Sequence, residues 1–569
     1  MLFSKKTVDS LVQEVHEKHG ETGLKRSLSS LALVSLGVGA VIGAGLFSIT
    51  GMAAANYAGP AIIISFVIAA VGCAFAGLCY AEFASMIPIA GSAYTYSYAT
   101  MGEFIAWIIG WDLVLEYSVG AATVASSWSG YLNKFLSNFN VSLPLELLMT
   151  PFDTATLADG TIIHGIVNLP AVFIIAIISL VLIKGTSGSS RLNNIIVILK
   201  VSIVIAFVIA GFKFIRPENF TPFIPENKGE FGAFGWSGII RAAGVIFFAY
   251  VGFDAVSTVA QETKNPKRSM PIGIMGSLFV CTVLYVIFAY VMIGVAKYTE
   301  FGAGSGADHL APVATAIAHM GYPDANGVIQ PAYPWLNQTI IIAILLGYTS
   351  VIMVMLLGQS RVFYSMSHDG LLPKVFSQLH SKFHTPAKSN LFFMVFVSLF
   401  AAFVPGRVVG EMMSIGTLFA FILVCAGIIV MRKSTPDAPR AFRTPLVPLI
   451  PILGILTCLG MMAFLPLDTW IRLVAWMMVG FSIYLSYGIK KSHLSARDTW
   501  KHRSQSYFIT SIIGLLLCVL LGILTLTHHY LSEEADISLI VFAIALTIFH
   551  LIYFGSYLKK SLNIKKQNI

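Results

Sequence analysis

The sequence predicts an all-α protein that crosses a membrane many times, because of its composition and the length of its apolar runs. Of the 569 residues, 56% are hydrophobic and 11% are charged, whereas soluble domains carry about 25% charged residues. A helix that crosses the hydrocarbon core needs about 20 predominantly apolar residues. On this criterion the chain contains about fourteen spans.

The predicted spans follow one another along the chain with few long connections. They cover roughly residues 31–57, 60–86, 101–131, 167–185, 193–214, 236–260, 272–296, 337–360, 389–404, 411–431, 447–466, 468–488, 508–528 and 536–557. The two long connections, 132–166 and 297–336, are rich in Gly, Pro and Asp, and neither has the size or pattern of a catalytic domain.

Basic residues are distributed unevenly between the connections. With the N-terminus placed in the cytoplasm, most of the 36 Lys and Arg residues fall in cytoplasmic segments. Cytoplasmic loops of membrane proteins carry such an excess. This pattern predicts a multi-pass protein of the cell membrane with both termini in the cytoplasm. It also accounts for the net charge of +9 without a nucleic-acid partner.

The six cysteines indicate neither disulfides nor a metal site. All of them fall inside predicted spans, no CxxC pair occurs, and no His/Cys cluster is visible. They are typical of small buried residues. We therefore expect no metal and no cofactor.

The first and sixth spans are interrupted. Four of the nine residues from Gly37 to Gly45 are glycines, and each costs roughly 1 kcal/mol relative to alanine in a helix interior. The sixth span carries Asp254 at membrane depth, after the segment 248–253. Paired interruptions in corresponding helices of two halves indicate the substrate site of a transporter.

The positions of the two interruptions predict an inverted repeat. The first span enters from the cytoplasm and the sixth from outside, so spans 1–5 and 6–10 form a five-plus-five repeat. The predicted organisation is a cytoplasmic N-terminal segment (1–30), a ten-helix transport core (31–432), four additional transmembrane helices (433–557) and a cytoplasmic tail (558–569).

The interruptions free backbone groups near the middle of the membrane. Gly43 lies about 18 Å along the first helix, and the N–H groups at the start of the second half-helix favour an anion. Free carbonyls suit an ammonium, so an α-amino acid fits both sets. The residues that we expect to bind it are Val41, Ile42, Gly43, Ala44 and Gly45 of span one, and Phe248, Ala249 and Val251 of span six. The alternative is a packing face of small residues with GxxxG spacing.

Lys200 is the candidate coupling residue. It lies within an apolar stretch of span five, about 13 Å from the cytoplasmic edge at Arg191. An intramembrane lysine is costly and is functional by default. Burial disfavours its charged form, so it could exchange protons. The alternative is a lysine that snorkels to the surface or is paired structurally.

Acidic residues occur in the same membrane region. Glu116 lies deep in span three, one turn after Asp112, and we expect it to line the pocket or a proton path. Asp254 is expected to cap or fix the restarted half-helix of span six. Arg241 is close enough to the outer end of span six to snorkel outward, as a structural or vestibule residue.

Several sequence blocks resemble the cationic amino acid transporter family of the amino acid–polyamine–organocation superfamily, bacterial-type permeases included. These blocks are Gly37 to Phe47, Glu82 to Tyr96, Gly110 to Tyr117, Phe247 to Thr258, Asn265 to Ile274, Gly358 to Pro373, Ile415 to Phe421 and Ala441 to Pro445. They extend over most of the chain and are specific in combination. The resemblance implies a leucine-transporter-type fold and amino acid uptake into the cytoplasm.

The resemblance also implies roles for single residues. It places the substrate carboxylate on Ala44 and Gly45, and the ammonium on carbonyls that include those of Val41, Phe248 and Val251. Phe248 becomes an aromatic gate, Glu116 a pocket acid, and Lys200 occupies the sodium position of sodium-coupled relatives. One departure is Ala44, where many relatives carry Ser or Thr, so the carboxylate depends on backbone N–H groups.

The sequence therefore predicts a secondary transporter, not an enzyme, that takes up L-amino acids with protons by alternating access. An amino acid exchanger is the first alternative, and a membrane-embedded enzyme or sensor is the second. Bulky apolar residues in span eight (Val354, Met355 and Leu356) favour small neutral amino acids over cationic ones. The expected partners are the amino acid, protons and the lipid bilayer, and no oligomeric state is predicted.

Overall fold

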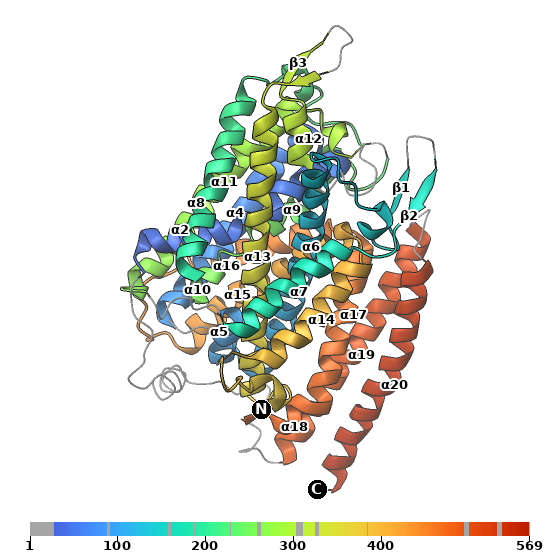
Figure 1. The fold of residues 1–569 in the computed structure, drawn as a ribbon. Coiled ribbons are helices and arrows are strands. Elements are labelled where there is room, and N and C mark those ends of the chain that lie inside the picture. The colour runs from blue at the N-terminus through green and yellow to red at the C-terminus, as the bar shows by residue number, and fades with distance from the viewer. Residues whose placement is uncertain are drawn as a thin grey trace.

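The protein is a bundle of long helices (Figure 1). The computed structural model describes residues 28–87, 92–156, 161–185, 189–227, 229–258, 263–302, 311–324, 329–383, 385–493, 500–531 and 537–567. Most of the predicted N-terminal segment 1–30, the last residues of the predicted tail 558–569 and part of the block Glu82 to Tyr96 lie outside the described residues.

Helices occupy every predicted span of the first half. The first span comprises α2 (Ser30–Val41), the π-helix η2 (Gly45–Ile49), α3 (Thr50–Ala53) and the π-helix η3 (Ala54–Ala58), followed by η4 (Gly59–Ala61). The next helices are α4 (Ile62–Met86), α5 (Ser92–Thr100), α6 (Glu103–Ser137), α7 (Leu169–Lys184) and α8 (Ser189–Phe212).

Helices also occupy the predicted spans of the second half. Its helices are α9 (Gly235–Ile246), the 3₁₀-helix η7 (Phe247–Tyr250), α10 (Ala255–Thr258), α11 (Pro266–Val295), α12 (Pro312–Ala318), α13 (Pro334–His368), α14 (Ala387–Phe403) and α15 (Gly406–Ser434). The chain ends with α16 (Leu449–Ala463), α17 (Leu467–Ile483), the π-helix η12 (Tyr484–Gly488), α18 (Ile489–Lys491), α19 (Trp500–Leu531) and α20 (Ile537–Gln567).

The two long connections each contain a small hairpin, and the chain has further single-turn helices. In one hairpin β1 (Thr154–Thr156) pairs antiparallel with β2 (Ile162–His164), and in the other β3 (Gly321–Pro323) pairs with β4 (Ile329–Pro331). The single-turn helices are η5 (Leu145–Leu147), η6 (Pro217–Phe220), η9 (Tyr298–Phe301) and η11 (Lys374–Ser377). Both hairpins lie at the upper end of the bundle in Figure 1.

Local sequence explains where several helices begin and end. Proline is the first residue of α11, α12 and α13, a position where its missing N–H costs nothing. Asn168 caps α7, because its side chain accepts a hydrogen bond from the N–H of Ala171 (3.3 Å). The same helix ends at Gly185, whose φ of +100° suits glycine.

The lengths of the helices support a protein that crosses a membrane many times. Within the described residues, 9 helices are long and apolar enough to cross, and the shorter apolar helices have 10–17 residues. The shorter ones coincide with predicted spans 1, 4, 6, 9 and 11, and two of them end at the interruptions. The polytopic helical class is confirmed. The count of fourteen, the inverted repeat and the domain boundaries stay predictions.

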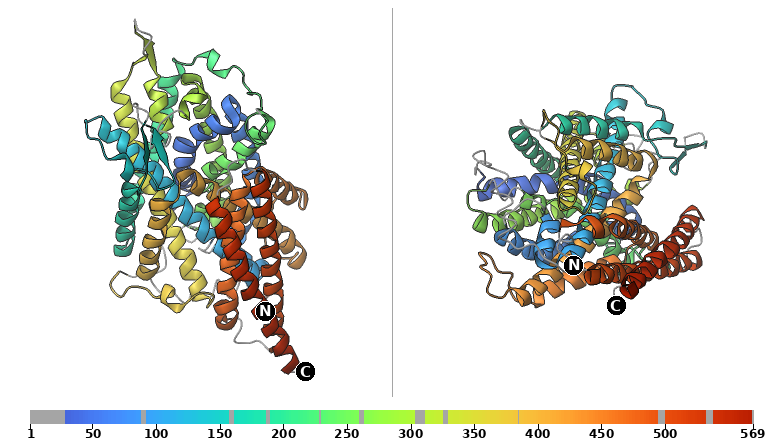
Figure 2. Two further views of the ribbon diagram at one scale, coloured as in Figure 1. Left: turned by 90° about the vertical axis from the view of Figure 1, so that its right-hand side faces the viewer. Right: turned by 90° about the horizontal axis from the view of Figure 1, so that it is seen from below.

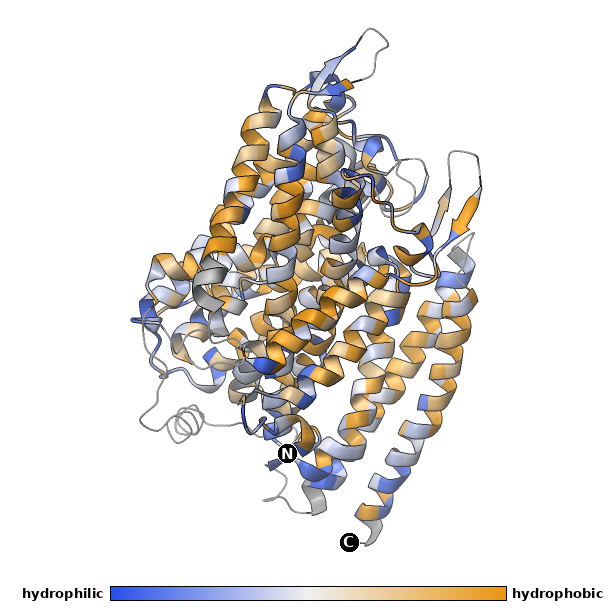
Figure 3. Cartoon of the chain, viewed as in Figure 1, coloured by the Kyte–Doolittle hydropathy of each residue, from blue (hydrophilic) through white to orange (hydrophobic). Residues whose placement is uncertain are grey.

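The bundle has a buried centre and an apolar outside. In α6, 89% of the most apolar stretch is buried, against 17% in α20. Helices α13 and α15 pack along α6, whereas α19 and α20 lie side by side at the edge (Figures 1 and 2). Apolar residues also cover the outside of the bundle (Figure 3). So much exposed apolar surface is suited to contact with lipid.

Helix α17 and the segment that follows it are bound to α6 by two sets of side-chain contacts, the first from α17 and the second from η12 and Ser492. The indole N–H of Trp111 donates to the carbonyl of Trp476 (2.9 Å), and Trp476 donates to that of Trp111 (3.0 Å). Their rings stack with centroids 4.5 Å apart. Near the start of α6, the Glu103 carboxylate accepts from the hydroxyls of Tyr484 (3.0 Å) and Ser492. A helix outside the predicted repeat thus packs directly on the central one.

Candidate functional site

The first interruption separates α2 from η2. Ile42 is extended (ψ 107°), and its N–H makes the last bond of α2, to Val38 O (3.0 Å). The next bonds run from Leu46 and Phe47 to Gly43 O (3.2 Å each). The N–H groups of Gly43, Ala44 and Gly45 therefore lie at the start of a new helix, where N–H groups lack intrahelical acceptors. This is the backbone break that the glycines predict.

The second interruption lies against the first. After η7, Val251 is extended, and Gly252 has a φ of +113°. A Cβ on Gly252 would lie 2.9 Å from Ala40 O, and one on Gly45 would lie 2.3 Å from Ala249 Cα. The two breaks therefore meet backbone to backbone, and each contact requires a glycine. Close packing, which was the alternative interpretation, is thus one reason for Gly45.

Side chains from two other helices donate hydrogen bonds to two of the carbonyls that the end of α2 leaves free. Lys200 Nζ of α8 donates to Gly39 O (2.9 Å), and the Tyr285 hydroxyl of α11 lies 2.9 Å from Val41 O. The same hydroxyl lies 2.8 Å from Ala249 O, at the second break. A hydroxyl carries one hydrogen, whereas each carbonyl oxygen has two lone pairs. Val41 and Ala249 can therefore still accept bonds from a ligand ammonium.

Lys200 is buried, with an exposed fraction of 1%. Its stem lies against Gly347 of α13, where a Cβ would come within 3.0 Å of Lys200 Cε. A snorkelling side chain would place its ammonium in water, so the structure disfavours that alternative. Within the part of the chain that is described, no carboxylate forms an ion pair with Lys200. Its ammonium instead binds the carbonyl end of α2, where the helix dipole favours a cation.

Three buried carboxyl groups come from α6 and from the end of the second break. Glu116 and Asp112 of α6 are 2% and 0% exposed, and Asp254 is 3% exposed. Asp254 directly precedes α10 and accepts a hydrogen bond from the Tyr117 hydroxyl (3.1 Å). Asp112 and Asp254 are the acidic neighbours of Glu116. The structure therefore groups these acids, which come from two distant parts of the sequence.

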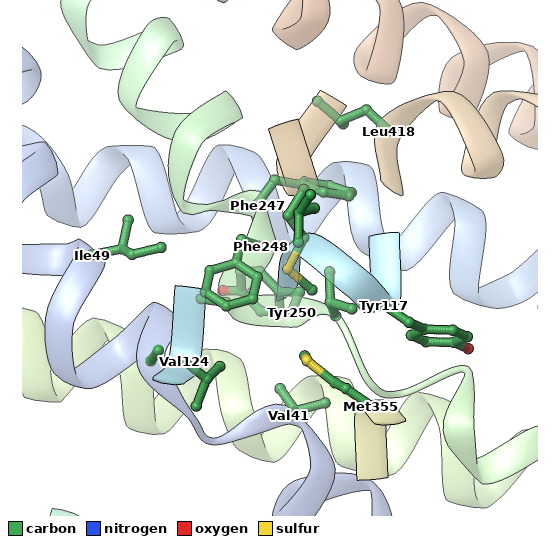
Figure 4. Close-up of a cluster of buried hydrophobic side chains, with 14 of the residues drawn as sticks. Val41, Ile49, Tyr117, Val124, Phe247, Phe248, Tyr250, Met355 and Leu418 are labelled. Atoms are coloured by element: carbon green, nitrogen blue, oxygen red, sulfur yellow. The ribbon is translucent and has the colours of Figure 1, made fainter. Parts of the chain in front are cut away.

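Apolar side chains from several helices surround the region between the breaks. Figure 4 shows Val41, Phe248, Val124 and Met355 converging there from different elements. A Cβ on Gly120 of α6 would lie 2.6 Å from Met413 Sδ and 2.9 Å from Met355 Sδ, so both methionines fill the space that this glycine leaves. Of the three bulky span-eight residues, Met355 is labelled in Figure 4 as part of this cluster.

A polar network includes Tyr57 of η3, and the sequence did not reveal it. The buried Glu411 of α15 accepts hydrogen bonds from the hydroxyls of Tyr57 (3.2 Å) and Thr469 (3.1 Å). Arg407 Nη1 lies 3.6 Å from the same carboxylate. Arg407 also borders a cavity of about 20 Å³ together with Ser48 and other residues, which has room for about one water. The network joins the end of the first helix to α15 and α17.

Arg241 lies next to this network, beside Tyr57. Its guanidinium donates to Phe464 O (3.2 Å) and lies over the Tyr57 ring, 5.5 Å from the centroid. This partly buried position agrees with a structural role. Among the described residues, no group of three or more His, Cys, Asp or Glu side chains could hold a metal ion.

Comparison with known proteins identifies the family. The model of the amino acid permease family matches residues 28–484. This chain belongs to the amino acid permease family. The match covers both breaks and α17, and it ends before α19 and α20.

Curated relatives of this permease cover most of its length. The branched-chain amino acid permease BcaP of Bacillus subtilis is 42% identical over 494 residues, which is 87% of this chain and 99% of the relative. The methylthioribose transporter of the same organism is 39% identical over the same shares. Cationic amino acid transporter 1 of Arabidopsis thaliana is 32% identical over 74% of this chain and 65% of its own length. These relatives are transporters, so the chain is a membrane permease and not an enzyme.

Proposed function

We propose that this permease takes up a neutral L-amino acid together with a proton, by alternating access around the two breaks. The observation that carries the proposal is the meeting of the breaks. It brings the N–H groups of Gly43 to Gly45 close to the carbonyls of Val41 and Ala249. A substrate with a carboxylate and an ammonium matches both groups. Phe248 is the proposed gate, and Ile42, Ala44 and Val251 complete the backbone site.

We propose that side-chain size at Met355 limits the substrate. Met355 and Val124 leave an apolar region beside the breaks, and an apolar pocket suits a branched or small neutral side chain. The name of the 42% identical relative supports branched-chain amino acids. Glu116 lies on the same helix as Gly120, one turn away, and is the proposed pocket acid.

Methylthioribose is the second candidate substrate, because the methylthioribose transporter is 39% identical to this chain. A methylthio sugar has neither a carboxylate nor an ammonium, so it would not use the charged ends of the site. Competition against labelled leucine by valine, alanine, arginine and methylthioribose separates the candidates. Inhibition by methylthioribose alone would contradict the amino acid proposal.

The selectivity variant is Met355→Ser. Shortening this side chain should admit larger or cationic amino acids, so arginine should compete at least tenfold better than in the wild type, about 1.4 kcal/mol. Met353→Ser is the matched control on the same helix, since Met353 is only half-buried. An unchanged competition profile in Met355→Ser would show that another residue limits the pocket.

The coupling variant is Lys200→Met, which keeps the length of the side chain and removes its charge. We expect it to lose accumulation driven by an inside-alkaline gradient, while binding changes less, because Lys200 holds the end of α2 and not the substrate. Uptake into proteoliposomes, with and without external sodium, measures this. Lys213→Met, an exposed lysine just after α8, is the control. Sodium dependence of the wild type, or accumulation by Lys200→Met, would contradict proton coupling through Lys200.

A further inference from the structure

A groove of about 690 Å³ lies at the surface between α4, the start of α11 and the segment before α16. Lys267 and Arg268 of α11 line one part of it, together with Phe442. Leu78 of α4 and Ile272 and Met275 of α11 line the apolar part. The groove is separate from the breaks, and no step of the proposed transport cycle uses it.

The basic part of the groove has no acidic partner among the residues that the structure describes. Lys267 and Arg268 are both exposed, and neither side chain has a hydrogen bond or ion pair to any residue that the structure describes. The nearby arginines differ. Arg432 and Arg440 are both paired with Glu82 at the end of α4, at 2.9 and 3.2 Å. The described lining contains no carboxylate, so the groove presents two cations next to the positive end of the α11 dipole.

The apolar part of the groove continues into the outer surface of the bundle. Ile272 lies one turn beyond Arg268 and is 43% exposed. Farther along α11, Phe279, Val283 and Ile287 are also exposed, and this stripe faces lipid in a membrane protein. Met275 lies about 10 Å along the helix from Arg268. A ligand that fits both parts needs an anionic head and an apolar chain.

We propose that this groove binds an anionic phospholipid of the surrounding membrane. Its phosphate contacts Lys267 and Arg268, and one acyl chain lies along Leu78, Ile272 and Met275. Basic pockets at the cytoplasmic membrane surface bind lipid headgroups in this way. A free phosphate would use the cations but not the apolar part, so the shape and chemistry of the lining favour the lipid.

The bound lipid would also act on the first broken helix through α11. The Ser30 hydroxyl at the start of α2 donates to the Ser269 hydroxyl, next to Arg268 (2.9 Å). Gly273 and Gly276 of α11 pack against Leu33 and Val34 of α2. A lipid on the outer side of α11 would therefore stabilise its packing on the half-helix that ends at Val41.

Lipid binding to the purified full chain tests the proposal. The wild type in detergent is mixed with phosphatidylglycerol or phosphatidylcholine, and the retained lipid is counted by native mass spectrometry. We expect selective retention of phosphatidylglycerol, and about tenfold weaker retention in the double variant Lys267→Gln, Arg268→Gln. The control double variant Lys374→Gln, Lys382→Gln removes two exposed lysines elsewhere and should bind as the wild type does.

The other arms of the experiment identify the contacts. Ile272→Gln keeps both cations and should weaken retention if the acyl chain lies in the groove. Equal retention of the two lipids, or unchanged retention in the double variant, would overturn the proposal. It would also be overturned if soluble glycerol 3-phosphate alone raised the Tm as much as phosphatidylglycerol. If the double variant does not fold, each single variant should show about a threefold loss.

Discussion

At the scale of residues, the two central glycines of the first break have different physical roles. A Cβ on Gly45 would lie 2.3 Å from the backbone of Ala249, which cannot move without displacing the second break. A Cβ on Gly43 would lie 3.2 Å from a methyl of Val351, which a small adjustment relieves. Replacing Gly45 would therefore disturb the fold itself, and Gly43 is the better position for testing the substrate carboxylate.

Gly43→Ala should fold and should bind substrate at least tenfold more weakly, about 1.4 kcal/mol, because the methyl group blocks close approach of a carboxylate to the backbone. Thermal shift with leucine measures the affinity. The double variant Gly43→Ala, Val351→Ala provides room for the new methyl group. If that second change restored binding, the defect would be packing against Val351, and the carboxylate assignment would lose its support.

At the scale of elements, the broken helices are held together by side chains from helices that are themselves continuous. Tyr285 of α11 bridges Val41 O and Ala249 O, and Lys200 of α8 holds Gly39 O. Unpaired carbonyls at membrane depth are costly because no water is available to them. These two side chains therefore allow the interruptions to exist, and they leave the N–H groups of Gly43 to Gly45 for a ligand.

Tyr285→Phe removes the bridging hydroxyl and should destabilise the protein by about 1–3 kcal/mol, the cost of an unsatisfied buried polar group. Substrate binding should weaken as well, since the two breaks are no longer joined. Tyr553→Phe is the matched control, because the Tyr553 hydroxyl donates to Ser482 O (3.1 Å) far from the breaks. It should lower thermal stability without changing the affinity for leucine. Equal affinity losses in both variants would remove the special role of Tyr285.

At the scale of the whole molecule, α17 is integrated with the central helix and with the network at Glu411. It contacts α6 through Trp476 and reaches Glu411 of α15 through Thr469. Its outer neighbours α19 and α20 pack against it, and the family match ends before them. We infer that α17 is part of the functional unit, although it lies outside the predicted repeat.

Trp476→Phe removes one of the two reciprocal indole bonds and part of the ring stack. The expected cost is about 1–3 kcal/mol, measured as a shorter half-life of leucine binding by the heated protein in detergent. Trp470→Phe is the control, since the Trp470 indole donates to Met462 O (2.9 Å), within the last four predicted helices. If both variants lost binding at the same rate, the α6–α17 contact would have no particular importance.

Local composition predicted the features that depend on neighbours in the sequence. The length of each apolar run reflects the thickness of the membrane, so the helices appear at the predicted spans. The glycine cluster at 37–45 predicted the first break, because glycine weakens a helix wherever it is placed. Burial of Lys200 also followed from its place in the sequence, between two apolar runs.

Only the tertiary structure decided which groups satisfy the backbone at the breaks. Tyr285 and Val41 are separated by 244 positions, and Tyr57 and Glu411 by 354. A tyrosine or glutamate inside one apolar span carries no sign of its partner, because the partner depends on how distant helices pack. The close approach of Gly45 to Ala249 likewise exists only once the two breaks meet, so the sequence carries no sign of this packing role.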